Sequence, residues 1–302
     1  MNYLFLIIGI LLLMIVFTDF FLTVISVSGA GLVSSRLSGY VCDVFLWVGE
    51  KSGQRVVLKY AGAIITLTLI TWWILGLWLG FYLLLLSDPY SVLVATSEVP
   101  GNSTDKMYFS GYVLSTMGNG DFKPGLPSWQ IVIAVFSFTG FIFFTTAMTY
   151  LISVSSAVIH KRSGALFINN ILRLPASRQL QHVLDNASDI VDMINVHNQH
   201  HLAYPVIHYF FSMKEKSSFI VNIWRLNRLV TSADNGAGAS EKADLLIGAI
   251  EDYLDTISGG YIANLRDKDG EGLNDTEIRD KQLKKLLRSG GWDPDRVSDS
   301  AN

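Results

Sequence analysis

Three long apolar runs dominate the first half of the chain, at residues 2–27, 60–86 and 129–158. Each has at least the roughly 20 residues that a helix needs to cross the hydrocarbon core of a bilayer. After residue 160 the apolar positions instead recur every three or four residues, as in amphipathic helices. The pattern predicts an all-α membrane protein with three transmembrane helices and a helical soluble domain.

Charges around the runs indicate how the chain crosses the membrane. Residues 29–58 carry Arg36, Lys51 and Arg55, and the third run ends in a basic cluster at 160–162. Because basic residues favour the cytoplasmic side, we expect a multi-pass cell-membrane protein with its N-terminus outside and its C-terminus in the cytoplasm. An amphipathic helix is expected around residues 40–48, either in the membrane interface or packed on protein.

The first run is interpreted as a span and not as a cleaved leader. It lacks a basic stretch before it, and its apolar core is longer than leaders use. Gly76 and Gly80 in the second run have the spacing that lets two helices approach closely. The net charge of −3 argues against nucleic acid as a partner. Cys42, the one cysteine, cannot form an intramolecular disulfide and is expected to be a buried or interfacial free thiol.

The soluble half shows three apolar patterns, at 180–194, 204–230 and 243–257. A doubly wound nucleotide-binding domain would need alternating strands and a Gly-x-Gly-x-x-Gly after the first strand. Gly236-Ala237-Gly238 has neither a third glycine at the required position nor a buried strand before it. We therefore expect a small helical domain with an unknown cytoplasmic ligand or partner.

The segment Ser-Thr-Met-Gly-Asn-Gly-Asp at 115–121 lies between the second and third runs. Residues 106–115 contain one glycine and no proline, which predicts a short helix whose partly negative C-terminal end faces this segment. Gly118 and Gly120 adopt positive φ readily, so successive carbonyls can point in one direction. Backbone left unpaired at membrane depth has to line a water-filled path.

This segment resembles the Thr-Val-Gly-Tyr-Gly-Asp selectivity filter of the potassium channel superfamily, with a pore helix before it and an inner helix after it. The resemblance implies a homotetramer in the lipid bilayer that conducts monovalent cations and needs no cofactor. It implies these roles for single residues: the ion-lining backbone at Thr116, Met117, Gly118, Asn119 and Gly120, and the acid of the outer mouth at Asp121.

Asn119 departs from the family pattern, in which an aromatic residue packs behind the filter. Asparagine can form a hydrogen bond there but cannot fill the same volume. The substitution predicts a wider or more mobile filter that discriminates weakly between potassium and sodium.

Two residues inside the spans invite a functional interpretation. Asp19 needs a partner, because a charged carboxylate at depth costs about 2.5 to 3.5 kcal/mol on insertion scales. It is expected to bond to the pore module, to place charge near the cytoplasmic vestibule, or to reach interfacial water. Gly140 stands where the resemblance places the gating hinge of the inner helix, and close packing is the alternative explanation.

These patterns predict five parts of the chain. Residues 1–28 form the N-terminal transmembrane helix, and 29–58 form a cytoplasmic loop with an interfacial helix. The pore module occupies 59–160 and comprises an outer helix, the pore helix, the filter and the inner helix. Residues 161–290 form the helical cytoplasmic domain, and 291–302 form a polar tail that we expect to be disordered.

Two polar clusters have the appearance of metal sites. The first comprises four histidines and two acids, of which His197 and His201 have the spacing that shares a helix face: His197, His200, His201, His208, Asp189 and Asp192. Without cysteines or a strict motif we expect packed or solvated histidines and no metal. Residues 267–278 resemble a calcium loop, but its twelfth position is occupied by isoleucine where a bidentate glutamate is required, so a charged connecting loop is expected.

The leading hypothesis is a tetrameric cation channel that conducts potassium and is gated by the inner helix and the cytoplasmic domain. The alternative is a non-conducting membrane sensor or assembly subunit that retains the pore fold. An enzyme is not expected, because no nucleophile, base and orienting acid assemble from the sequence.

Overall fold

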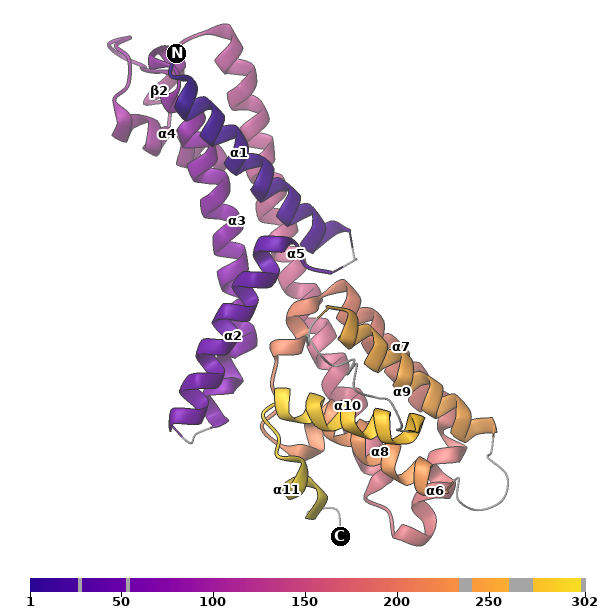
Figure 1. Ribbon diagram of the computed structural model, residues 1–302. Coiled ribbons are helices and arrows are strands. Elements are labelled where there is room, and N and C mark those ends of the chain that lie inside the picture. Colours follow the sequence, from indigo (N-terminus) through magenta and orange to yellow (C-terminus); the bar gives the residue numbers. More distant parts are fainter. Residues whose placement is uncertain (27–28, 53–54, 234–240, 261–273, 300–302) are drawn as a thin grey trace. The chain divides into compact units, whose positions relative to one another are not determined.

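The computed structural model describes residues 1–26, 29–52, 55–233, 241–260 and 274–299, most of them in helices (Figure 1). The described residues divide into two compact units. The first unit comprises residues 1–26, 30–37 and 66–152, and the second comprises the described residues of 38–65 and 153–299. Three helices begin in one unit and end in the other.

The first unit contains the three apolar runs and the segment between the second and third. Its elements are α1 (Tyr3–Phe20), a π-helical turn η1 (Phe21–Ile25), the start of α2 (Leu32–Ser52), most of α3 (Ala61–Leu86), η3 (Pro89–Ser91), β1 (Val92–Val94), α4 (Ser103–Leu114), β2 (Phe122–Pro124) and the first part of α5 (Pro127–Leu172). Three helical segments are long and apolar enough to cross a membrane: Tyr3–Ile25, Arg55–Leu86 and Pro127–Leu172. The predicted all-α membrane fold with three spans is confirmed.

Helix α1 packs closely on α3 through the predicted pair of glycines. A Cβ atom built on Gly76 would lie 2.5 Å from Cγ2 of Val16, and one on Gly80 would lie 2.7 Å from Cδ2 of Leu13. Aromatic side chains bring α1 against α5 as well, since the rings of Phe20 and Phe143 are stacked with their centroids 4.1 Å apart. The first run is therefore a packed member of the helical unit.

Helix α5 continues well beyond the point at which the third span was predicted to end. The basic residues at 160–162 were expected to mark the cytoplasmic end of the span, and the helix runs past them without interruption to Leu172. A helix tolerates charged residues once it has left the bilayer. The basic cluster at 160–162 is therefore consistent with the end of the span but does not end the helix.

The second unit is built from short helices around one core. Its elements, besides the parts of α2, α3 and α5, are η2 (Arg55–Tyr60), α6 (Ala176–Asp185), α7 (Ala187–Ala203), η4 (Pro205–Tyr209), η5 (Glu215–Ser217), α8 (Phe219–Ala233), α9 (Glu241–Gly260), α10 (Asp275–Ser289) and α11 (Pro294–Asp299). The predicted apolar face of α9 is confirmed, since these residues are all buried: Leu246, Ile250, Tyr253, Leu254 and Ile257. The prediction of a helical soluble domain is confirmed.

Two predictions for the second unit were incomplete or wrong. The pattern at 180–194 is divided between α6 and α7 at Asn186, which leaves the helical conformation with φ of −106° and ψ of 19° while its side-chain amide donates to the His182 carbonyl at 2.8 Å. The expected disorder of the tail is wrong for residues 291–299. Trp292 packs against the core and Val297 is buried in it, and these two apolar side chains hold α11 in place.

Candidate functional site

The helix before the predicted filter is fixed at its N-terminus by reciprocal hydrogen bonds. Oδ1 of Asn102 accepts from the Asp105 backbone N–H at 3.0 Å, and Oδ2 of Asp105 accepts from the Asn102 N–H at 2.9 Å. This capping box starts α4 three residues before the predicted helix. The buried Lys106 ammonium then donates to the backbone carbonyls of Leu85 at 3.1 Å and Asp88 at 2.6 Å, which anchors α4 to the end of α3.

The loop after α4 has an alternating backbone conformation. Thr116, Gly118 and Gly120 have φ angles of +58°, +59° and +83°. The first of these turns is set by the end of the helix, where the Met117 N–H donates to the Tyr112 carbonyl at 2.9 Å. The prediction of positive φ at the two glycines is confirmed. Thr116, the remaining residue with positive φ, is β-branched. A non-glycine residue in this region of φ and ψ stores about 1 to 3 kcal/mol of strain.

Two tyrosine side chains of α4 form hydrogen bonds to this loop and to the residue just after it. The Asn119 side-chain amide donates a hydrogen bond to the hydroxyl of Tyr108. The hydroxyl of Tyr112 donates to the Phe122 carbonyl at 3.1 Å, just beyond the loop. The polar asparagine therefore bonds to the pore helix at the position where the resemblance places an aromatic ring.

A two-stranded ribbon holds the outer end of the loop. Strands β1 and β2 are antiparallel, with Val92 opposite Pro124 and Val94 opposite Phe122. The backbone N–H of Ala95 donates to the carbonyl of Asp121 at 2.9 Å. The chain between α3 and α4, which contains β1, thus holds the segment that follows the two glycines.

The predicted filter residues lie together on this one loop, and residues 115–121 are exposed in the single chain. One side of the supporting helix is fixed by Trp78, whose indole N–H lies 3.0 Å from the Ser110 hydroxyl oxygen. The loop is consequently held at both ends while its own backbone remains accessible. Such a backbone can present carbonyl oxygens to a dehydrated cation once several chains surround an axis.

Gly140 lies against the C-terminal end of α4. A Cβ atom at this position would be 2.1 Å from the Leu114 carbonyl oxygen, far inside van der Waals contact. Any larger residue would separate α5 from α4. The structure thus gives Gly140 a close-packing role, and its action as a hinge stays a prediction.

A cavity of about 560 Å³ opens beside the start of the filter loop. It is bounded by residues of α3, α4 and α5, including Trp78, Thr116 and Gly140. Most of its lining is aromatic or aliphatic, among which are Leu77, Leu114, Phe141, Phe143 and Phe144. The cavity lies between two candidate membrane-spanning helices, and its apolar lining matches the hydrocarbon core of a bilayer.

Asp19 is the centre of a buried hydrogen-bond network in the first unit and is only 3% exposed. Oδ1 accepts from the backbone N–H groups of Val33 and Ser34, both at 3.0 Å, near the start of α2. Oδ2 accepts from the Ser34 hydroxyl at 2.5 Å and from the indole N–H groups of Trp72 and Trp73 at 3.2 and 3.1 Å. Of the three expected placements, the structure shows the bond to the pore module, because both tryptophans lie on α3.

The predicted histidine cluster is divided by burial. His197 and His201 are 2% and 1% exposed, whereas Asp189 and Asp192 lie on the exposed side of α7. Within the described part of the chain, no group of three or more histidine, cysteine or acidic residues is arranged to hold a metal ion. Most of the calcium-like segment, residues 267–273, lies outside the described residues.

Comparison with known proteins defines the class to which this chain belongs. Residues 63–156, which include α4, the filter loop and most of α5, match the family described as "Ion channel". The chain is also 32% identical over 282 residues to the uncharacterized membrane protein YdjJ of Bacillus subtilis (strain 168), a match that covers 87% of this chain and 80% of that protein. The chain therefore belongs to the pore-loop ion-channel family with a two-transmembrane pore module. No solved structure matches the chain significantly.

Several residues that build the site were missed from the sequence. Tyr108 was expected to be part of the pore helix, but its bond to Asn119 spans eleven residues and follows no short motif. The ribbon of β1 and β2 has only three residues in each strand, too few for an alternating pattern to be recognised. The capping box at Asn102 and Asp105 was the one local signal that the sequence offered.

Proposed function

We propose that this protein is a homotetrameric cation channel that conducts potassium through the backbone of Thr116 to Gly120. The observation that carries the proposal is the alternation of positive φ at Thr116, Gly118 and Gly120. It occurs directly after a helix end, in the segment that the ion-channel family match covers. An alternating backbone of this kind supplies carbonyl oxygens in place of the water that surrounds a cation.

Two electrostatic features favour cations over anions at this loop. The C-terminal end of α4 carries a partial negative charge and immediately precedes Thr116. Asp121 is exposed at the other end of the loop, where it concentrates cations at the outer mouth. One chain contributes one such loop, so the ion path requires several chains around an axis, and the resemblance to potassium channels implies four.

Weak selectivity for potassium over sodium follows from the support behind the filter. One hydrogen bond between Asn119 and Tyr108 takes the place of a packed aromatic ring. A neutral hydrogen bond contributes about 0.5 to 1.5 kcal/mol and leaves more freedom than a filled volume. The filter is therefore wider or more mobile than in the family.

The orientation and gate complete the proposal. The N-terminus lies outside the cell and the C-terminus in the cytoplasm, since the basic residues of the α2 segment and of 160–162 favour the cytoplasmic face. The inner helix α5 forms the gate. The helical domain of residues 161–290 shifts the equilibrium between the open and the closed state. Gly140 is the proposed hinge.

Ion flux through the purified full-length protein in liposomes tests this function. The wild type is expected to pass potassium, and Gly120→Ala is expected to abolish the flux because φ of +83° is strained for alanine. Gly248→Ala is the matched control, since its Cβ atom would meet no neighbour within 4 Å. Correctly assembled tetramers that pass no cation at any tested voltage or pH would contradict the proposal and favour the non-conducting subunit.

A further inference from the structure

A small cavity of about 40 Å³ lies inside the second unit, far in sequence from the filter loop. Polar side chains from several elements line it: Lys161 of α5, His197 and His201 of α7, His208 of η4, Ser218 before α8, and Tyr253 of α9. Neither the ion-channel match nor the proposed conduction path uses these residues. Their convergence in one buried place calls for a function of its own.

His197 has buried hydrogen-bonding groups that the protein does not satisfy. Its side chain is 2% exposed, and neither ring nitrogen has a hydrogen-bond partner among the described residues. Its neighbours are aromatic, with the ring centroids of Phe219 and Tyr253 at 4.2 and 5.5 Å. Leaving a buried polar group unpaired costs about 1 to 3 kcal/mol, so a polar molecule in the cavity would recover that free energy.

Lys161 supplies a positive charge in the wall of the same cavity. Its ammonium donates to the carbonyls of Ile207 at 3.0 Å and Phe210 at 3.3 Å, which occupy two of its three protons. Within the described ranges, its charge forms no ion pair with a carboxylate. Lys161 is partly buried, and the two carbonyls supply no net negative charge to balance its ammonium.

The three histidines of the cavity are neutral bases. Burial, followed by the nearby charge of Lys161, lowers the pKa of His208 to about 4. Burial also lowers the pKa of His197 and of His201 well below the usual value. The lining thus combines one cation, neutral imidazoles and four hydroxyls, and it includes no carboxylate; the hydroxyls belong to Ser212, Ser218, Tyr253 and Ser289.

This chemistry favours an anion over a metal ion. A transition metal would have to bind beside the Lys161 ammonium, whose charge repels it. The acids that could offset this repulsion, Asp189 and Asp192, lie on the exposed side of α7. An anion, in contrast, accepts hydrogen bonds and neutralises the charge at the same time.

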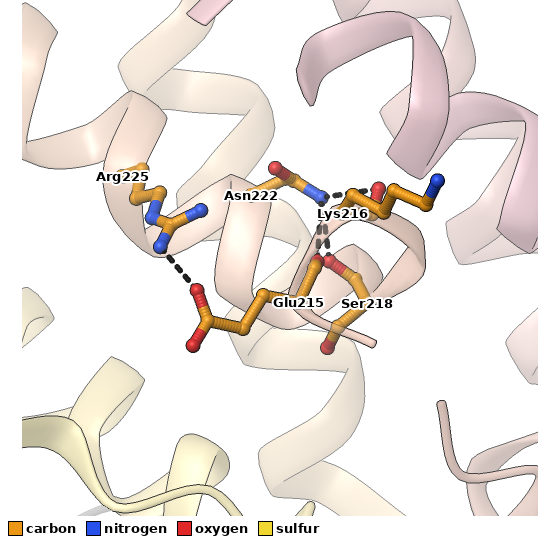
Figure 2. A network of polar contacts seen from close by, with 5 residues as sticks. All are labelled: Glu215, Lys216, Ser218, Asn222 and Arg225. Carbon is orange, nitrogen blue, oxygen red and sulfur yellow. Dashed lines mark hydrogen bonds and ion pairs between the residues drawn. The ribbon is translucent and has the colours of Figure 1, made fainter. Parts of the chain in front are cut away.

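The chain segment that forms one wall is held in place by the polar network in Figure 2. Arg225 pairs with Glu215 at 2.5 Å, and the Asn222 amide donates to the backbone carbonyls of Ser218 at 2.8 Å and Lys216 at 3.3 Å (Figure 2). These bonds fix the turn that leads into α8 and carries Ser218. A wall fixed before binding reduces the entropy that a ligand has to overcome.

We propose that this cavity is a binding site for a small oxyanion, held by the Lys161 ammonium and by His197. A buried water needs about 10 to 15 Å³, so a cavity of this size accommodates about three waters or one oxyanion of four or five heavy atoms. Inorganic phosphate and short carboxylates fit this description. The site goes beyond the proposed conduction and is independent of it, because binding can be measured without flux.

Thermal unfolding and calorimetric titration of the full-length protein in detergent test the site. Sodium phosphate and sodium acetate are the probes, with sodium chloride at equal ionic strength as the reference. We expect one or both oxyanions to raise the Tm and to bind with a stoichiometry of one per chain. Removing a charged hydrogen-bond donor in Lys161→Met should weaken binding about 10- to 100-fold.

His197→Phe separates a binding role from a structural one. Phenylalanine fills the same space without unpaired nitrogens, so the protein should fold with an unchanged or higher Tm yet lose the response to oxyanion. His182→Gln and Lys242→Met, both at exposed positions, are the matched controls and should retain the response.

Three results would overturn the proposal. The first is a Tm that responds to phosphate and acetate no more than to chloride. The second is an oxyanion response that His197→Phe and Lys161→Met retain in full, which would place binding elsewhere. The third is stabilisation by Zn²⁺ and not by oxyanions, which would make the cavity a metal site.

Discussion

The side-chain amide of Asn119 donates its hydrogen bond to the hydroxyl of Tyr108, eleven residues earlier in the chain. This bond joins the middle of the filter loop to the helix that carries it. In a pore whose ion path is backbone, the distance between the loop and its supporting helix sets the width of the path. In the proposed pore, selectivity can therefore be altered through these two side chains while the backbone carbonyls that line the path stay the same.

Selectivity is expected to change in opposite directions at the two residues. Asn119→Tyr should restore an aromatic ring behind the filter and raise the permeability of potassium relative to sodium. Tyr108→Phe removes the hydroxyl acceptor and should lower that ratio. Reversal potentials under bi-ionic conditions measure both effects, with Tyr90→Phe as the exposed control. Equal potassium preference in wild type and Asn119→Tyr would contradict the assigned role.

Gly140→Ala is expected to destabilise the protein. The new Cβ atom would lie 2.1 Å from the Leu114 carbonyl oxygen, and overpacking of this kind costs about 1 to 3 kcal/mol. Thermal unfolding in detergent should show a lower Tm, whereas the control Gly248→Ala should leave it unchanged or raise it slightly. An unchanged Tm would contradict the assigned close packing of Gly140 against Leu114. Altered gating in such a variant would indicate that Gly140 acts as a hinge instead.

Replacing Asp19 by asparagine should be costly. One carboxylate oxygen becomes an NH₂ group that faces donors, so either the two backbone N–H groups or the indole N–H groups of Trp72 and Trp73 lose their acceptor. Each hydrogen bond to a charged group contributes about 1.5 to 3 kcal/mol, so Asp19→Asn should lower the Tm and the yield of assembled protein. Asp43→Asn, on an exposed face of α2, is the control. An unchanged Tm would show that the network is dispensable.

The free energy of unfolding should decrease as the pH is lowered, because of the buried histidines. The pKa values of His197, His201 and His208 are lowered in the fold, so the unfolded chain binds more protons than the folded one below the unfolded value of about 6.5. Their contribution to stability is complete above that pH and is lost as the pH falls toward 4. At pH 5 the loss is about 2 kcal/mol for each histidine that stays neutral in the fold.

Unfolding scans from pH 8 to pH 5 check this dependence. The Tm should drop in the wild type and drop less in His208→Phe, while the exposed His182→Gln should behave as the wild type. A Tm that is constant over this range would show that the three imidazoles gain protons equally in both states.

Arg55 should be required for the order of the C-terminal segment. Its guanidinium donates to the carbonyls of Gly290 at 2.8 Å and Ser212 at 3.2 Å and lies 3.4 Å from the centroid of the Trp292 ring. Lysine cannot reproduce this planar geometry. Arg55→Lys should therefore increase the rate of proteolytic cleavage near residues 290–294, and the exposed Arg36→Lys should not.

The sequence predicted the elements whose cause is local. Length and apolar composition were sufficient for the three spans, and alternating glycines were sufficient for the positive φ at Gly118 and Gly120. Thr116 could not be predicted in the same conformation, because its side chain disfavours it and the helix end imposes it. The division at Asn186 likewise depends on the backbone conformation of a single residue, which the apolar pattern does not record.

Features that depend on distant residues were not accessible from the sequence. The cavity of Lys161 and His197 needs α5, α7, η4 and α9 to fold around it, and no spacing along the chain records that convergence. The order of α11 rests on Trp292 and Val297, which stand in an otherwise polar segment. Single apolar residues of this kind become informative only when the surface that receives them is known.

The network around Asp19 also constrains the order in which the chain assembles during synthesis. When α1 enters the bilayer, its carboxylate has none of its later donors, because α2 and the tryptophans of α3 have not yet been translated. The backbone of Val33 and Ser34 arrives first, and the indoles are translated later still, since Trp72 lies 53 positions after Asp19. Until then the carboxylate lacks the hydrogen-bond donors that offset the cost of a charge within the membrane. The Asp19 network therefore links the final packing of α1 to the later translation of α3.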